Sequence, residues 1–250
     1  MLELLMSVGG AKAGKWFPNS GPGNKELLFG TPALGYFGVI PSAEVMSYKS
    51  YKDNLNPNMA ITMSNGDGWF KFFYRGKIIY MSCKAIGYSV SWEAVYQAGG
   101  VYGVNNIGTY PVGNPKMQYR PMTITSDGKP WTLIPRLPHT NDVDGGAAAG
   151  RQLDTFEYNS LMGRLVGNIN IPEGQYVNWY GKWASFDHVQ LDMDKSNLGM
   201  ETGDASNRDR STNRGGLGYP LNAVQPVKTF VANTVALRGT LELYGYLEPF

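Results

Sequence analysis

The chain has 250 residues, 17% of them are charged, and its formal net charge is +2. A chain of this length can bury a core without disulfides or metal ions. The charged fraction lies below the roughly 25% of an ordinary soluble domain. The 32 glycines and 15 prolines favour short strands and many turns over a helical bundle. A net charge this small offers no broad basic surface for a phosphate backbone, so we predict no nucleic-acid binding.

The single cysteine, Cys83, excludes an intramolecular disulfide framework and a thiolate zinc cluster. No stretch approaches the roughly eighteen apolar residues of a membrane span, and the apolar N-terminal run is short and lacks a basic flank. We therefore expect no membrane insertion, and folding in the cytosol.

Residues 1–40 are predicted to form an extended anchoring arm. The segment KWFPNSGPGNKELLFGTPALGYFG is rich in glycine and proline and shows no helical or strand period. It cannot bury its own large apolar side chains, so we expect it to pack on the body or on a neighbouring subunit. The residues predicted to make this assembly contact are Trp16, Phe17, Leu28, Phe29, Tyr36 and Phe37. Deleting residues 2–38 should then leave a folded body.

Residues 41–250 are predicted to form one β-rich globular body. A short helix is expected over residues 41–49, with Ser42 as its N-cap. Two aromatic and β-branched runs, residues 69–74 and 77–83, flank Arg75-Gly76 and predict a hairpin.

A second helix is expected from Ser91 to Gln97, ended by Gly99 or Gly100 in a left-handed conformation. One face of this helix, formed by Trp92, Val95 and Tyr96, is predicted to be buried.

A second hairpin is predicted for residues 118–125 and 129–136 around Ser126-Asp127-Gly128. A helix is expected near residues 155–166, with Asp154 and Glu157 in a capping-box arrangement.

Strand-like segments follow at residues 167–190. Residues 192–216 are then predicted to be a long polar contact loop. The end of the chain, TVALRGTLELYGYLEPF, predicts one or two strands. The predicted fold class is α+β, mostly antiparallel β with a few short helices and an extended Gly/Pro-rich N-terminal arm.

The sequence contains no recognisable catalytic or metal-binding constellation. His139 and His188 lack a nucleophile motif, and Glu173 has no identifiable acid/base partner. Asp192 and Asp194 have the spacing that begins a calcium loop, but Asn197 stands where that loop needs glycine. We therefore predict that the protein is not an enzyme and binds no cofactor or metal.

An aromatic cluster, Trp179, Tyr180 and Trp183, has two interpretations. Flat aromatic faces can stack on sugar rings, which makes these residues a candidate glycan contact. They can equally fill an interface between a sheet and a helix, and this interpretation is favoured.

Four segments in chain order resemble structural proteins of tailed bacteriophages. They are SGPGNKELLFGTPALGYFGVI, GWFKFFYRGKIIYMSCKAIGYSVSWEAVYQAGGVYG, EYNSLMGRLV and LRGTLELYGYLE. The shared motifs are Gly35-Tyr36-Phe37-Gly38, Gly76-Lys77, Ser91-Trp92 and Val101-Tyr102-Gly103.

The resemblance implies a structural subunit of the virion, in the tail, baseplate, neck or fibre-attachment region. Such a subunit would contact copies of itself and other virion proteins through its N-terminal arm and aromatic-rich surfaces. An alternative is a receptor- or glycan-binding module on the same particle, whose partner is a host surface glycan or receptor.

Overall fold

The computed structural model describes residues 19–88, 90–108, 114–138, 157, 161, 196–202, 210–214, 223–226, 235–237 and 240–244. The structural statements below concern these residues.

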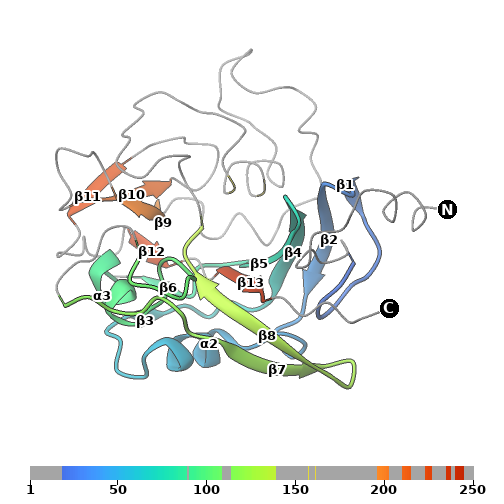
Figure 1. Ribbon diagram of the computed structural model, residues 1–250, viewed down its shortest axis with the longest axis horizontal. Helices are drawn as coiled ribbons and strands as arrows, with labels where there is room; N and C mark the ends of the chain where they lie inside the picture. The colour runs from blue at the N-terminus through green and yellow to red at the C-terminus, as the bar shows by residue number, and fades with distance from the viewer. Residues whose placement is uncertain are drawn as a thin grey trace, which may run out of the picture.

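Most of the described strands belong to an antiparallel sheet of seven strands (Figure 1). In spatial order they are β1 (Phe29–Thr31), β2 (Leu34–Ile40), β4 (Trp69–Tyr74), β5 (Lys77–Ser82), β13 (Thr240–Leu243), β8 (Lys129–Arg136) and β7 (Met122–Ser126). Strand β13, from near the end of the chain, lies between β5 and β8 and pairs with both. This C-terminal strand therefore joins the two hairpins β4–β5 and β7–β8 into one sheet.

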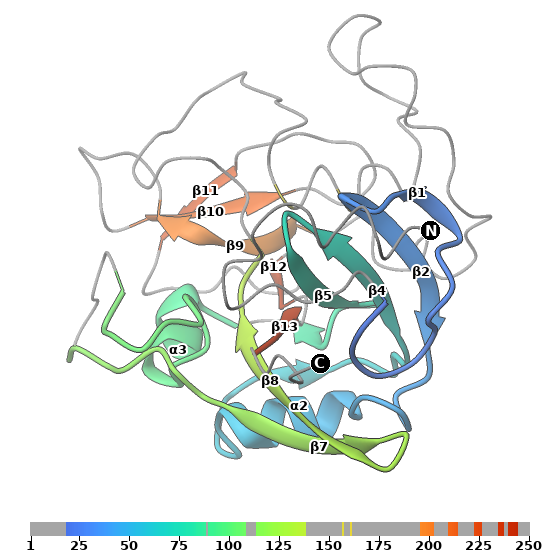
Figure 2. The same ribbon diagram turned by 45° about the vertical axis from the view of Figure 1, so that its right-hand side comes forward.

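A second sheet has six short strands, and all but one of its pairings are antiparallel. In order they are β11 (Ala223–Pro226), β10 (Arg210–Arg214), β9 (Ser196–Thr202), β12 (Val235–Leu237), β6 (Gly87–Tyr88) and β3 (Thr62–Met63). Two short helices, α2 (Tyr48–Leu55) and α3 (Trp92–Gln97), accompany the sheets. Both views place α2 at the bottom of the molecule and β9–β11 at the upper left (Figure 2). The prediction of mostly antiparallel β structure with short helices is confirmed.

Both predicted hairpins are present. Arg75 and Gly76 have φ angles of 49° and 83°, and Asp127 and Gly128 have 54° and 71°. Two consecutive left-handed residues match the twist of the flanking strands, which is why a two-residue turn of this kind closes a hairpin. The first strand of the second hairpin is shorter than predicted: β7 begins at Met122, whereas the predicted strand begins at residue 118.

The predicted helix after Ser91 is also confirmed. The Ser91 hydroxyl accepts a hydrogen bond from the Ala94 main-chain N–H at 3.1 Å, and Gly99 has a φ of 77°. Trp92 and Tyr96 are buried and stack with ring centroids 5.4 Å apart.

The predicted helix over residues 41–49 is wrong. Residues 42–44 form a turn, and helix α2 begins later, with Ser47 as its N-cap. The apolar stripe that anchors a helix here starts at Tyr48, because the buried side chains of α2 are Tyr48, Tyr51 and Leu55. The Ser42 hydroxyl instead accepts a hydrogen bond from the Gly68 N–H at 3.0 Å.

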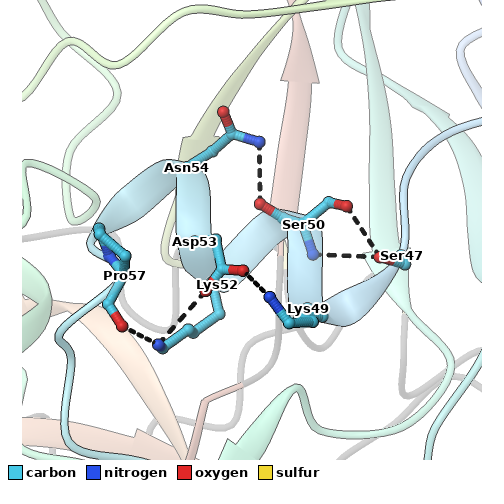
Figure 3. A network of polar contacts seen from close by, with 7 residues as sticks. All are labelled: Ser47, Lys49, Ser50, Lys52, Asp53, Asn54 and Pro57. Atoms are coloured by element: carbon cyan, nitrogen blue, oxygen red, sulfur yellow. Dashed lines mark hydrogen bonds and ion pairs between the residues drawn. The ribbon is translucent and has the colours of Figure 1, made fainter.

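The solvent-facing side of α2 carries its own polar network (Figure 3). Lys49 and Lys52 both pair with Asp53, and Lys52 also donates to the Pro57 carbonyl. The Asn54 amide donates to the Ser50 carbonyl at 2.8 Å. Water screens such exposed pairs, so this network serves a solvated helix surface and does not define a site.

Two further predictions concern the second half of the chain. Strands β9 and β10 lie inside residues 192–216, so the prediction of one long polar loop is wrong for these residues. Strand pairing uses main-chain groups and does not require apolar side chains. The one or two strands predicted for the C-terminal segment are present as β12 and β13, which belong to different sheets. Of the helix predicted near residues 155–166, Glu157 and Leu161 are described, and Glu157 is helical. The segment 167–190 lies outside the described residues.

The N-terminal boundary at residue 40 falls inside the main sheet. Strand β2 pairs with β4 from Leu34↔Tyr74 to Ile40↔Trp69. Removing residues 2–38 would therefore delete most of a paired strand, and we expect the remaining body to lose stability. Residues 1–18 of the predicted arm lie outside the described residues.

Within the described part of the chain, no helix is long and apolar enough to cross a membrane.

Candidate functional site

Residues 20–26, here called the strap, lie across one face of the main sheet. A Cβ atom added to Gly21 would stand 2.5 Å from the Tyr80 hydroxyl oxygen, and one added to Gly23 would stand 2.6 Å from the Ile40 side chain. Both glycines also have positive φ, 81° and 75°. The strap therefore needs glycine at these two positions, for its backbone conformation and for its close approach to the sheet.

Side chains of two strands bind the main chain of the strap, and a side chain of the strap binds the main chain of a third strand. Tyr80 of β5 donates to the Pro22 carbonyl at 2.9 Å. Lys71 of β4 donates to the Asn24 carbonyl at 2.7 Å and to the Gly21 carbonyl at 3.5 Å. The Asn24 amide donates to the Phe37 carbonyl of β2 at 2.9 Å. These bonds satisfy the strap's polar groups where they face the apolar sheet.

The far end of the strap reaches the second hairpin. The Lys25 ammonium lies 3.4 Å from the Asp127 carboxylate and 5.8 Å from the centre of the Trp131 ring. Its side chain is about half exposed, as is that of Asp127. The strap thus contacts β2, β4, β5 and the β7–β8 hairpin.

Lys71 is the unusual residue of this region, because its side chain is fully buried. Burial and, to a smaller extent, the positive charge of Lys25 lower its pKa to about 7, while Asp127 and Glu44 act in the opposite direction. Its ammonium lies 5.5 Å from the centre of the Phe37 ring. Among the described residues, no carboxylate lies within ion-pair distance of Lys71.

The strap leads directly into an exposed edge strand. Strand β1 pairs with β2, and among the described strands it has no partner on its other side. Leu28 is 48% exposed and Phe29 is 43% exposed, and Val39 of β2 is exposed as well. An edge with free main-chain groups and apolar side chains is a template for pairing with another chain.

The structure divides the predicted assembly residues into three groups. Leu28 and Phe29 lie at the exposed edge. Tyr36 and Phe37 are buried in their own chain, so of the two expected packings they show the one on the body. Tyr36 packs on Phe72 with ring centroids 5.5 Å apart. Trp16 and Phe17 lie outside the described residues, as do the candidate glycan contacts Trp179, Tyr180 and Trp183.

A second buried cation, Arg136 of β8, is surrounded by carboxylates. It donates to both oxygens of Glu157 at 2.7 and 2.6 Å and to Glu242 at 2.9 Å. Burial disfavours the charge of Arg136, but the two carboxylates outweigh this and raise its pKa. Burial likewise opposes ionisation of Glu242, yet Arg136 and Lys77 hold the pKa of that carboxyl below its usual value.

Sequence reasoning missed both buried cations. A signal for Lys71 was available, because it stands in the middle of the apolar strand WFKFFY, whose six residues are all buried. Glu157 was interpreted as part of a helix cap, and instead it binds Arg136. Within the described residues, no group of three or more His, Cys, Asp and Glu side chains could hold a metal ion.

Comparisons with protein-family models, with curated proteins and with solved structures find no match.

Proposed function

We propose that this protein is a structural subunit of a tailed-phage particle, in the tail, baseplate, neck or fibre-attachment region. In this proposal, the subunit contacts a neighbour in the particle through the exposed edge of β1. The observation that carries the proposal is that β1, among the described strands, has no partner on its outer side and stands beside the exposed side chains of Leu28 and Phe29.

The motifs behind the resemblance to phage structural proteins support the proposal. Three of them contain a glycine with positive φ: Gly38 at 94°, Gly76 at 83° and Gly103 at 66°. These residues are needed by the backbone of the body. The motifs that carry the resemblance therefore include positions at which this chain's own backbone favours glycine.

Light scattering on the full chain tests the edge contact. We expect a defined oligomer, and we expect Phe29→Lys to raise its dissociation constant by at least about 30-fold, as for a central apolar contact of an interface. The matched control is Met117→Lys, because Met117 is equally exposed (48%) but lies far along the chain from β1. A monomeric wild-type chain at all concentrations, or an equal effect of the two substitutions, would refute the β1 contact.

A soluble-glycan binding screen addresses the alternative role. A purely structural subunit should bind no glycan in the screen. Binding that is lost in Trp179→Ala and Trp183→Ala would transfer support to a receptor- or glycan-binding module.

A further inference from the structure

We propose that two copies of the protein exchange their straps. In the structure, residues 20–26 bind a surface of their own chain, here called the seat. In the exchanged form, the strap of one copy binds the seat of the other copy. The seat consists of Ile40, Lys71, Ile78, Tyr80 and Leu243. The inference rests on the proposed function, because it names the partner of this region as a second copy of the same chain.

The chemistry of the seat selects the strap as its occupant. Tyr80 and Lys71 donate to main-chain carbonyls, so the bound segment must present its backbone to the sheet. The close approach of Gly21 to Tyr80, Ile78 and Leu243 excludes a side chain at this position. A peptide without glycines at the positions of Gly21 and Gly23 would collide with the sheet. The strap of another copy meets all these requirements.

The topology allows the exchange without disturbing the sheet. The strap joins the body through residues 27–28, which lead into β1, and both views show β1 at the periphery of the sheet (Figures 1 and 2). Its contacts with the seat come from side chains and not from strand pairing. Leaving the seat therefore breaks none of the strand pairs. A segment that finds the same contacts on an identical copy is the usual material of a domain swap.

Lys71 couples strap release to proton uptake. Under the strap its pKa is about 7, and in contact with water it would return to its ordinary value of 10.5. The charged groups around it are Lys25 on the strap, Asp127 in the β7–β8 turn and Glu44 after β2. Between these two pKa values, release binds a proton, so the open fraction rises about tenfold for each unit of falling pH and levels off below pH 7.

Isotope mixing with a zero-length cross-linker tests the exchange. Unlabelled and ¹⁵N-labelled protein are incubated together at the concentration at which oligomers form and are then treated with a carbodiimide. This reagent joins the Lys25 amine to the Asp127 carboxylate, groups that are 3.4 Å apart. Cross-linked peptides with one labelled and one unlabelled half show that the strap of one copy sits on another. The internal control is the Lys77–Glu242 pair, 2.9 Å apart within the sheet, which should stay unmixed.

The pH dependence of mixing supplies a second readout. Incubation at pH 9 should slow the appearance of mixed Lys25–Asp127 peptides about 100-fold relative to pH 7. In Lys71→Met, a side chain of similar length without a charge, the two rates should agree within about twofold.

The outcomes separate this inference from the proposed function. Unmixed Lys25–Asp127 peptides at both pH values would overturn strap exchange, as would equal mixing of the Lys77–Glu242 control. If Phe29→Lys still dissociates the oligomer in that case, the β1 contact stands and only the exchange fails. The opposite combination is mixed Lys25–Asp127 peptides together with an oligomer that Phe29→Lys does not weaken. This result would support exchange and refute the β1 contact.

Discussion

The main sheet buries two cationic side chains, and the pKa of one is raised while the pKa of the other is lowered. Arg136 of β8 is 2% exposed and binds two carboxylates and a carbonyl, and the two carboxylates raise its pKa against the effect of burial. Lys71 of β4 is fully buried and, among the described residues, meets carbonyl oxygens and an aromatic ring; its pKa falls to about 7. A buried charge that is paired stays charged, whereas one that is not paired becomes a group that titrates near neutral pH.

This difference suggests different roles for the two regions. Arg136 links β8 to β13 through Glu242 and to the helical residue Glu157, so its pairing fixes segments that are distant in sequence. Lys71 holds a single N-terminal segment, and it does so with a charge that burial disfavours. Arg136 thus ties distant parts of the sheet together, whereas Lys71 lies in the sheet beneath the strap that we propose to be exchanged.

Breaking the ion pair between Arg136 and Glu157 should have the largest effect on the free energy of unfolding. Arg136→Met leaves the buried carboxylate of Glu157 without its cation, and we expect the free energy of unfolding to fall by about 3–5 kcal/mol. Urea denaturation measures this loss. The double variant Arg136→Met/Glu157→Leu should recover most of it. A single variant within about 1 kcal/mol of wild type would show that the pair does not carry the stability ascribed to it.

Burial of Lys71 should make the free energy of unfolding depend on pH. The pKa of Lys71 is about 7 in the folded chain and 10.5 when the side chain is exposed, so the unfolded chain binds more protons between these values. Burial of Lys71 therefore does not reduce the free energy of unfolding above pH 10.5, where the side chain is neutral in both states. As the pH falls from 10.5 to 7, the free energy of unfolding decreases by at most about 1.4 kcal/mol per pH unit. Urea midpoints at pH 7, 8 and 9 measure the slope. Lys71→Met should reduce this slope; an unchanged slope would assign it to another group.

The close packing of the strap can be separated from its backbone conformation. Gly23→Ala adds a methyl group 2.6 Å from Ile40 at a φ of 75°, and Gly128→Ala adds one at a φ of 71° with no heavy atom within 4 Å. We expect Gly128→Ala to cost about 1 kcal/mol from backbone strain alone, and Gly23→Ala to cost about 1–3 kcal/mol more. Thermal unfolding compares the two. Equal losses would mean that the strap does not press on the sheet.

The exposed pair of the strap should have the smallest effect. Lys25 and Asp127 are about half exposed, so Lys25→Met should lower stability by less than about 1 kcal/mol, and added salt should reduce the difference. Denaturation at low and at high salt measures both. A loss comparable to that of Arg136→Met would contradict the distinction between exposed and buried pairs drawn here.

Local signals of the sequence were sufficient for several elements. The turns at Arg75-Gly76 and Asp127-Gly128 and the cap at Ser91 depend on residues within a few positions of one another. The helix predicted over residues 41–49 failed because a second serine, Ser47, stands next to a better apolar stripe. Residues 1–40 were assigned to an arm because glycine and proline hide a strand pattern. Strand β2 nevertheless pairs with β4, which supplies the partner that its composition does not reveal.

The sequence by itself determined the β-rich class, the two hairpins and the capped helix α3. Only the tertiary structure decided which strands are neighbours and what surrounds each buried charge. Arg136 meets a carboxylate 106 positions away, and Lys71 meets a carbonyl 47 positions away. A turn or a cap is settled by the conformations open to a few adjacent residues. The partner of a buried charge depends on how distant segments pack, and no local pattern encodes this.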